Sequence, residues 1–271
     1  MPGGRPRSSQ PFRRLLAGAA LLGSQLTAGP STELPAWDLP GWQLVLAEDF
    51  DSPAGPGRFA TTYPGWAGYD GAQDTSRHLG RPAATQGQYD SAGTTTVHDG
   101  LVDIRLHTAN GTPRVMALTP TPDGQWWDGS TYGRYSVRFR TETVPGYKVA
   151  WLLWPTSDEW TEGEIDFPEG ALGDEIAGAS HSTAGDPSVN AWTVDTGATM
   201  AEWHVATIEW LPDRLTFTLD DRSWTTTEPT AIPHRPMRWV LQTETELTAG
   251  PPDPEVSGHV YVDWVAAWRP G

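Results

Sequence analysis

Three acidic side chains, Glu164, Asp166 and Glu169, stand within six residues of one another in a Trp-rich stretch that otherwise has the composition of a β-strand. Like charges crowded this closely cannot all ionise easily, so one carboxyl should keep its proton towards neutral pH while another stays anionic. A protonated carboxyl beside an anionic one can supply an acid and a nucleophile to the same reacting bond.

The three side chains can act together only if they face the same side of the strand. Side chains alternate along a strand, so Glu164 and Asp166 share a face, whereas Glu169, five residues from Glu164, should point to the other. One extra residue in a β-bulge corrects this mismatch. Pro168 cannot donate a ladder hydrogen bond and is a residue type found in sheets mainly at edges and bulges. The spacing therefore predicts a bulge between Asp166 and Glu169 that brings all three carboxylates to one cleft.

Two carboxyls roughly 5 Å apart suit retaining glycoside hydrolysis, in which one attacks the anomeric carbon and the other protonates the leaving oxygen and then activates water. A solvated acidic face or a set of calcium ligands is the alternative interpretation of so short a pattern. Trp151, Trp154 and Trp160 lie just before the carboxylates, and the chain holds 15 Trp. Indole rings can stack on the C–H face of a sugar ring, which makes Trp154 and Trp160 candidates for substrate binding, whereas about half of the tryptophans are expected to fill the core of the sheet sandwich.

These residues belong to a longer pattern that resembles glycoside hydrolase family 16, which includes laminarinases, lichenases, agarases and carrageenases. The pattern consists of residues 132–140 (YGRYSVRFR), 150–155 (AWLLWP) and 163–169 (GEIDFPE), preceded by a first strand at 42–51 and followed by His181, 203–210 and 262–265. The last of the three segments matches the family's bulged E-x-D-x-x-E form. The resemblance spans about residues 42 to 269.

The resemblance implies a role for each residue of the site. Glu164 is the nucleophile, Glu169 is the general acid/base, and Asp166 hydrogen-bonds to the nucleophile and tunes its charge. Trp160 stands where the family has a tryptophan that stacks on the sugar next to the scissile bond. His181, on the strand expected to follow, would line the floor of the cleft, with a structural role as the alternative.

The sequence departs from the family pattern at two places. Phe167 and Pro168 stand where the family more often has two aliphatic residues, and residues 242–244 (QTE) stand where a strand containing Asn is common. Glu244 and Glu246 are therefore candidate subsite residues of this branch, or else part of a solvated edge. Of the two, Glu244 is favoured for the cleft.

No catalytic metal or cofactor is expected, because the sequence shows no Cys–His zinc pattern, H-E-x-x-H motif or P-loop and its seven His are dispersed. Many members of the family hold a structural calcium far from the cleft, near the first strand and an aspartate of a C-terminal strand. Glu48 and Asp263 occupy corresponding positions. A structural calcium is thus one expectation, and such an ion would take 6 to 8 oxygen ligands.

The beginning of the chain has the layout of a secretory signal peptide. Four Arg precede an apolar run at residues 15–22, and small and polar residues follow at 24–31. That apolar run is shorter than the about 20 residues of a membrane-spanning helix. We predict a signal peptide and short linker at residues 1–33, a secreted catalytic domain at 34–271, and no membrane association after export. A disordered basic tail is the alternative.

The formal net charge is −16, and removal of residues 1–28 takes away four Arg and no acidic residue. So acidic a protein is not expected to bind nucleic acid, and it repels anionic polymers, which favours a neutral glucan over a sulfated galactan. The chain has no Cys, so oxidising conditions outside the cell do not affect it.

Short alternating runs separated by 29 Gly and 25 Pro indicate an all-β fold. Together with the resemblance they predict a two-sheet antiparallel β-sandwich, a concanavalin-like jelly roll with a substrate cleft. Tryptophans inside apolar runs are candidates for its core, namely Trp210, Trp239 and Trp264. The expected strands are 101–106, 135–140, 148–154, 176–180, 204–210, 215–219, 238–242 and 260–268.

The irregular stretch 53–93 is expected to build one wall of the cleft, with Arg77 and His78 as candidate contacts to sugar hydroxyls; a packed surface loop is the alternative.

The sequence thus predicts a monomeric, secreted, retaining endo-glycosidase that hydrolyses internal β-linkages of a polysaccharide, most readily a β-1,3- or β-1,3-1,4-glucan. Four alternatives remain at this stage: a hydrolase of galactan-type polysaccharides, a transglycosylase of the same family, a non-catalytic glycan-binding sandwich protein, and a cell-envelope structural protein that uses the acids to bind calcium.

Overall fold

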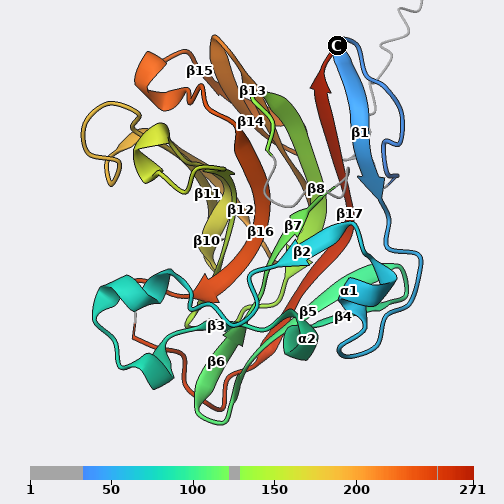
Figure 1. Cartoon of the computed structure of the whole chain (residues 1–271), viewed down its shortest axis with the longest axis vertical. Coiled ribbons are helices and arrows are strands. Elements are labelled where there is room, and N and C mark those ends of the chain that lie inside the picture. The colour runs from blue at the N-terminus through green and yellow to red at the C-terminus, as the bar shows by residue number, and fades with distance from the viewer. Residues whose placement is uncertain (1–32, 122–128, 249) are drawn as a thin grey trace, which may run out of the picture.

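The computed structural model describes residues 33–121, 129–248 and 250–271. Two antiparallel sheets stack face to face and curve together (Figure 1). The predicted fold class, an antiparallel two-sheet sandwich, is confirmed. Residues 1–32, which hold most of the predicted signal peptide and linker, lie outside the described residues.

The outer, convex sheet is built on the long C-terminal strand, which pairs with three others. Its strands, in order across the sheet, are β15 (Arg222–Thr226), β14 (Arg214–Leu219), β13 (His204–Leu211), β8 (Gly133–Thr141), β17 (Gly258–Pro270), β5 (Leu101–Ala109), β6 (Thr112–Val115) and β3 (Gln88–Tyr89). Off this path, β1 (Trp42–Glu48) pairs with β17, and β4 (Thr95–His98) pairs with β5. The pairing of β3 with β6 is parallel.

The inner sheet carries the acidic hexapeptide and forms the floor of the cleft. Its strands, in order, are β12 (Asn190–Thr199), β11 (Glu175–His181), β10 (Ile165–Ala171), β9 (Tyr147–Pro155), β16 (Met237–Thr245), β7 (Ala117–Pro120) and β2 (Trp66–Gly68). All pairings in this sheet are antiparallel.

Helices in the described chain are short and lie in the connections. They are α1 (Phe59–Thr62), α2 (Ser91–Thr94), η1 (Thr75–Leu79), η2 (Ala83–Thr85), η3 (Trp160–Glu162) and η4 (Pro229–Ala231), where η denotes a 3₁₀ helix. None of them is long and apolar enough to cross a membrane.

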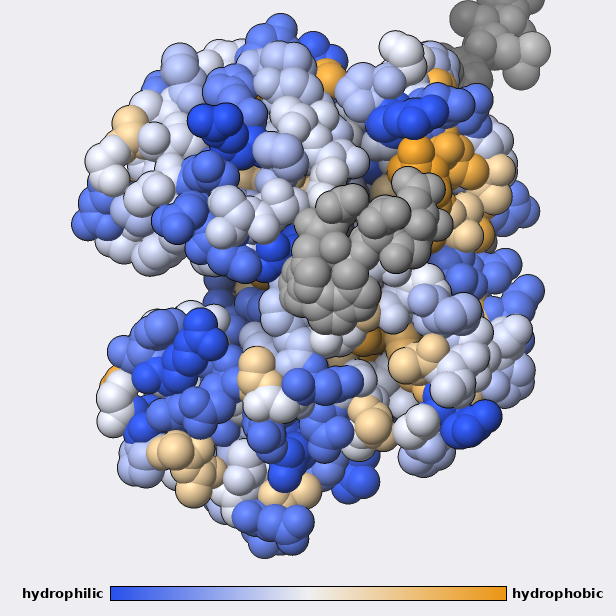
Figure 2. All heavy atoms as spheres, viewed as in Figure 1, coloured by the Kyte–Doolittle hydropathy of each residue, from blue (hydrophilic) through white to orange (hydrophobic). Residues whose placement is uncertain are grey.

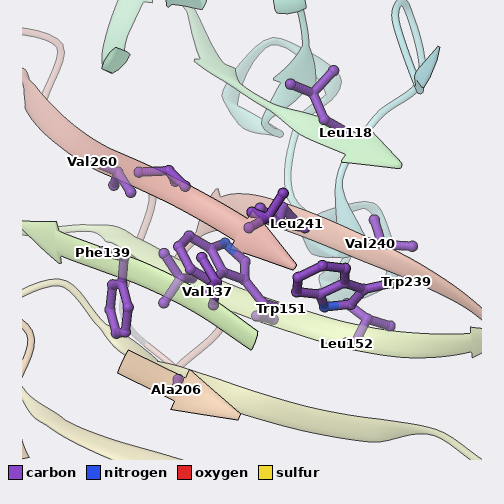
Figure 3. Close-up of a cluster of buried hydrophobic side chains, with 14 of the residues drawn as sticks. Leu118, Val137, Phe139, Trp151, Leu152, Ala206, Trp239, Val240, Leu241 and Val260 are labelled. Carbon is purple, nitrogen blue, oxygen red and sulfur yellow. The ribbon is translucent and has the colours of Figure 1, made fainter. Parts of the chain in front are cut away.

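Aromatic and aliphatic side chains fill the space between the two sheets (Figure 3). Trp210 and Trp239, both predicted as core residues, belong to this cluster and are 0% and 4% exposed. Trp264, the third prediction, is also buried but lies outside the main cluster. Trp151 is fully buried, and its ring packs against Phe139 with centroids 4.9 Å apart. Trp151 is therefore a core residue and not one that stacks on sugar.

Each of the eight expected strands falls within an observed strand that extends one to three residues further at one or both ends. The ladder hydrogen bonds continue past the last apolar residue of each run, so an apolar pattern does not show where a strand ends. Strand β12, at the edge of the inner sheet, was missing from the expected set. It has only two buried residues, Val194 and Thr196, so its sequence lacks an apolar pattern strong enough to reveal it.

Candidate active site

A cleft of about 470 Å³ opens on the face of the inner sheet that points away from the core. Its lining comes from the irregular segment 69–89, from the floor strands β9 and β16, and from residues 158–164 after β9. Figure 2 shows the surface hollowed between two lobes, which in Figure 1 are the segment carrying η1 and η2 and the lobe carrying η3. The irregular segment thus forms a wall of the cleft, as expected.

Strand alternation decides which residues reach the cleft. On β9, Val149, Trp151 and Leu153 are fully buried in the core, whereas the intervening Leu152 and Trp154 line the cleft. On β16, Arg238, Val240 and Gln242 line it in the same way.

Strand β10 contains the bulge that the acidic spacing predicts. Asp166 pairs with Leu152 of β9, and Glu169 pairs with Ala150, so three steps along β10 match two steps along its neighbour. The pairing with β11 shifts at the same place. Phe167, inside the bulge, is buried and stacks on Phe217 with centroids 4.7 Å apart. The extra residue therefore turns an aromatic ring into the core and returns Glu169 to the face of Asp166.

Two glycines flank the acidic segment where other residues would not fit. Gly163, just before Glu164, has φ +111°, and a Cβ there would lie 2.6 Å from Cγ of Pro233. Gly170, just after Glu169, has φ +152°, and its Cβ would lie 2.8 Å from the carbonyl oxygen of Glu175. A larger residue at either position would be strained by its positive φ and would clash with Pro233 or with the backbone of Glu175.

His181 on β11 lies beside two of the three carboxylates. Its Nε2 is 3.6 Å from Oε2 of Glu164 and 3.4 Å from Oδ2 of Asp166. Its Nδ1 is 2.8 Å from the carbonyl oxygen of Pro187. A carbonyl can only accept, so Nδ1 carries a proton and Nε2 is the atom that faces the acids. The ligand atoms of these three residues lie within 4.8 Å of one another, close enough to hold a cation. A protonated imidazole neutralises the same charges.

Burial and mutual repulsion alter the pKa values of this group. Burial raises the pKa of Glu164 well above its ordinary value, and the charge of Asp166 adds to the effect. Burial raises the pKa of Asp166 to about 6, and the neighbouring His181 opposes this rise. Burial opposes protonation of His181, but the charges of Asp166 and Glu164 outweigh it and raise the His181 pKa to about 9. At neutral pH the imidazole is therefore a cation, and the carboxyls hold a proton more readily than free ones.

The two tryptophans predicted to bind substrate lie on the cleft. Trp160 is 37% exposed, and its side chain also hydrogen-bonds to Glu164. Its ring centroid is 5.5 Å from that of His181. Trp154 lines the cleft, and its Nε1 donates to Oδ1 of Asp158 at 3.0 Å. Both indoles are thus positioned to contact a sugar chain that enters the cleft.

Glu169, the third carboxylate, has an unexpected partner in Lys148 of β9. Nζ of Lys148 donates to Oε1 of Glu169 at 2.7 Å. Neither Lys148 nor this ion pair was anticipated from the sequence. One signal was available, because Lys148 is the single lysine among the 18 Lys and Arg residues of the chain.

Glu244, predicted to lie in the cleft, is instead buried behind its wall. The side chain is on β16 and only 2% exposed. Its Oε1 accepts hydrogen bonds from the backbone N–H of Thr75 at 3.0 Å and from the hydroxyl of Tyr89 at 3.2 Å. Thr75 and Tyr89 line the cleft themselves. Glu244 therefore supports the wall from within and does not face the sugar.

A second buried acid, Asp74, fastens the same wall. It is 1% exposed and accepts from the backbone N–H groups of Thr245, at 2.8 Å, and Gly87, at 3.1 Å. The sequence did not single it out. Arg77 and His78, the predicted hydroxyl contacts, both lie on the cleft lining.

Arg238, another residue that was not anticipated, also lines the cleft. It donates to the hydroxyl of Tyr69 at 2.7 Å and to the carbonyl oxygen of Pro155 at 3.0 Å, and it pairs with Asp158.

The two residues considered for calcium lie on neighbouring strands of the outer sheet, away from this cleft. Asp263 forms an ion pair with Arg138, whose guanidinium also lies 4.4 Å from the ring of Trp203. Oε1 of Glu48 accepts from the backbone N–H of Phe50 at 3.2 Å. Asp263 already has a cationic partner of the chain's own, so this arrangement does not fit a calcium ligand at that position.

The family model for glycosyl hydrolases family 16 matches residues 90–266, which include all the carboxylates of the cleft. The chain belongs to this family, and it is a glycoside hydrolase. The expected family and the expectation of an enzyme are confirmed, and the alternative of a non-catalytic sandwich protein is set aside. Its substrate is accordingly a carbohydrate with a glycosidic bond.

Solved structures share the fold at low sequence identity. The laminarinase from Rhodothermus marinus superposes with a TM-score of 0.66 at 20% identity, covering 85% of this chain and 98% of that one. The laminarinase from Flavobacterium sp. UMI-01 gives 0.66 at 17%, covering 84% and 100%. The endo-β-1,3-glucanase from Pyrococcus furiosus gives 0.64 at 18%, covering 85% and 96%. No curated protein matches the sequence.

Proposed function

We propose that this protein is a secreted endo-glycosidase that hydrolyses internal linkages of a β-1,3- or mixed β-1,3-1,4-glucan with retention of anomeric configuration. The observation that supports the proposal is the bulge in β10, at which Asp166 pairs with Leu152 and Glu169 with Ala150, two positions on one face of β9. Glu164, immediately before the strand, lines the cleft and hydrogen-bonds to Trp160. Two carboxyls on one cleft can share the two roles that retaining hydrolysis needs.

In the first step Glu164 attacks the anomeric carbon while Glu169 gives its proton to the glycosidic oxygen. The bond from the anomeric carbon to that oxygen breaks, and the sugar becomes an ester of Glu164. The imidazolium of His181, 3.6 Å from Oε2 of Glu164, favours the ionised nucleophile. Asp166 lies between Glu164 and Glu169 in the sequence, and its carboxylate holds the imidazolium of His181 in place.

In the second step Glu169, now ionised, takes a proton from water as that water attacks the same anomeric carbon. The ester bond breaks, Glu164 returns as a carboxylate, and Glu169 is again protonated. Each of the two displacements inverts the anomeric carbon, so the product keeps the configuration of the substrate. Besides the substrate and one water molecule, the two steps need only the carboxyl groups of Glu164 and Glu169, and we propose that no cofactor takes part.

Three features support a neutral β-glucan as the substrate. Solved proteins of the same fold carry the names laminarinase and endo-β-1,3-glucanase. The formal net charge of −16 disfavours anionic polymers. The cleft is open to the surface (Figure 2), so a chain can lie across it without threading an end. Export and a monomeric state remain expectations from the sequence. A structural calcium away from the cleft would need a ligand other than Asp263, which pairs with Arg138; a fall in melting temperature on chelation would be the test.

The first experiment is reducing-sugar release from laminarin, lichenan, agarose, carrageenan, galactan and xyloglucan. Wild type should cleave laminarin or lichenan, and Glu164→Gln and Glu169→Gln should each lower that activity by about 10³-fold or more while the fold survives. Proton NMR of the first product should show the β-anomer. Full activity in either variant, or an α-anomer, would contradict the proposed mechanism. Products longer than the substrate would identify a transglycosylase.

A further inference from the structure

Lys148 is the single lysine of a chain that uses arginine everywhere else, and it lies next to the proposed acid/base. The residue is 8% exposed, and its Nζ is 2.7 Å from Oε1 of Glu169. Within the described chain, Lys148 is the one side chain that donates a hydrogen bond to Glu169. A buried ammonium is costly unless it is paired, so the contact with Glu169 is a requirement of the fold as well as a local bond.

Strand register places a second acid on the other side of the lysine. Glu244 of β16 stands opposite Lys148 of β9. Both belong to the set of alternating positions that points away from the core, as do the cleft-lining Leu152 and Gln242. The inner sheet thus carries a row of charges, negative on β16, positive on β9 and, whenever Glu169 is ionised, negative on β10. Burial works against the charge of Lys148, but Glu169 and Glu244 outweigh it and raise the lysine pKa above its ordinary value.

We propose that Lys148 is a positioning residue for acid/base catalysis: its ammonium binds Oε1 of Glu169 and directs Oε2, with its proton, into the cleft, while Glu244 supplies a second counter-charge. Glu244 also holds Thr75 of the cleft wall through the 3.0 Å bond to the Thr75 backbone N–H. The same buried acid therefore connects the wall of the cleft to the residue that aligns the acid/base.

The chemistry of an ammonium group explains the direction of the effect. Lysine has three N–H donors and no acceptor. A protonated Glu169 must therefore carry its proton on Oε2, because Lys148 already donates to Oε1. When that proton passes to the leaving oxygen, the new carboxylate stays bound to Lys148, and Oε2 is free to accept a proton from the attacking water. Lys148 itself neither gives nor takes a proton in either step.

Arginine would not serve equally well here. Its planar guanidinium is larger and binds a carboxylate through both oxygens at once, whereas an ammonium is a compact point charge that can hold one. A bidentate arginine would occupy the oxygen that must reach the substrate. This difference accounts for lysine at the one position where the chain departs from arginine.

The test compares two substrates that differ in their need for an acid, and it rests on the function proposed above. The glucan has a poor leaving group, which needs a proton to depart. In a 2,4-dinitrophenyl β-glycoside of the same sugars, the 2,4-dinitrophenolate leaves without one. For Lys148→Met, kcat/KM on the glucan should fall roughly 10- to 100-fold because the acid is misplaced. On the aryl glycoside it should fall less than about threefold, since acid assistance is not used.

Four further variants help to interpret that result. Glu169→Gln should likewise lose more activity on the glucan than on the aryl glycoside. Adding Lys148→Met to Glu169→Gln should cause little further loss, because both substitutions act through one group. Arg134→Met removes a partly buried cation that pairs with Glu209 on the outer sheet, and it should not discriminate between the substrates. Lys148→Gln, whose amide can still donate to Oε1, should lose less activity on the glucan than Lys148→Met, and the labelling experiment below tests the inference if Lys148→Met does not fold.

The outcomes separate the two ideas. Equal losses on both substrates in a folded Lys148 variant would assign the residue a purely structural role and overturn the inference. Absence of selectivity in Glu169→Gln would instead overturn the proposed function.

A spectroscopic measurement needs no substrate. Because Lys148 is the only lysine, ¹³Cε-lysine labelling gives a single signal, which should shift in Glu169→Gln and Glu244→Gln and stay in place in Asp186→Asn, a substitution on an exposed loop. No shift in Glu169→Gln would contradict the inference.

Discussion

Nε2 of His181 lies 3.4 Å from Oδ2 of Asp166, and Nδ1 of the same ring donates a hydrogen bond to the carbonyl oxygen of Pro187. This second contact fixes the orientation of the ring, so the charge of the imidazolium is directed at the acids and not at solvent. The pair places a cation beneath the nucleophile and links β10 to β11 at the floor of the cleft. Its pH behaviour can therefore be measured both as stability and as activity.

His181 should make stability depend on pH. Its pKa is raised to about 9 in the folded protein from an ordinary value near 6.5. The native state thus binds the proton more tightly, so the contribution is fully present below about pH 6.5 and is lost as pH rises through about 9. His181→Gln should lower the free energy of unfolding most at pH 6.5 and least above pH 9. Urea titrations across this range, with the exposed His234→Gln as control, measure it; parallel curves for wild type and His181→Gln would contradict the prediction.

On acidification, activity should begin to decline at a higher pH than it would if the carboxyls had their ordinary pKa values. Burial raises the pKa of Asp166 to about 6 and that of Glu164 above its ordinary value, so acidification protonates the pair early. We expect kcat/KM on the glucan to fall as pH drops through about 6. Asp166→Asn removes a negative neighbour of Glu164 and should move this limb to lower pH, with a reduced maximum. If the decline of wild-type kcat/KM occurred only below pH 4.5, the raised pKa values of Asp166 and Glu164 would be contradicted.

Trp160 should contribute both a stacking surface and a bond to the nucleophile. Trp160→Ala removes both and should lower kcat/KM by about 10- to 100-fold, given that an aromatic contact of this kind contributes about 1–3 kcal/mol. Trp160→Phe keeps a ring but loses the hydrogen bond to Glu164, so its deficit should appear mainly in kcat. Trp37, which is 55% exposed and outside the cleft, provides the control. A change in Trp37→Ala as large as that in Trp160→Ala would remove the case for a subsite.

Asp74 should matter for the wall of the cleft. An asparagine at this position would present an amide to the N–H donors of Thr245 and Gly87, leaving a buried donor unsatisfied at a cost of about 1–3 kcal/mol. Asp74→Asn should therefore lower the free energy of unfolding and raise KM, since the segment it fastens lines the cleft. Urea unfolding and steady-state kinetics check both effects, with the exposed Asp186→Asn expected to behave as wild type. If Asp74→Asn were destabilised but its KM were unchanged, the segment that Asp74 fastens would not contribute to substrate binding.

Much of the fold could be predicted because alternation and the chemistry of single residues are local properties. The apolar runs around Trp210 and Trp239 marked strands that pack into the core. The odd spacing of Glu169 from Glu164, together with Pro168, required the bulge that β10 contains. Trp151, which precedes the carboxylates like Trp154 and Trp160, was assigned to neither the cleft nor the core, and its place on β9 turns it to the core. Alternation counted from Trp154 would have given that answer.

What the sequence by itself determined was the class of fold, the acidic segment and its bulge, and the membership in a family of glycoside hydrolases. The tertiary structure alone decided which distant residues meet. Glu244 lies 169 positions from Thr75, and Asp74 lies 171 positions from Thr245, yet each pair is hydrogen-bonded. Lys148 reaches Glu169 because β9 and β10 are neighbours in the sheet. A buried charge must find a partner wherever the strand order places one, and strand order follows from the packing of the whole chain, not from spacing along it.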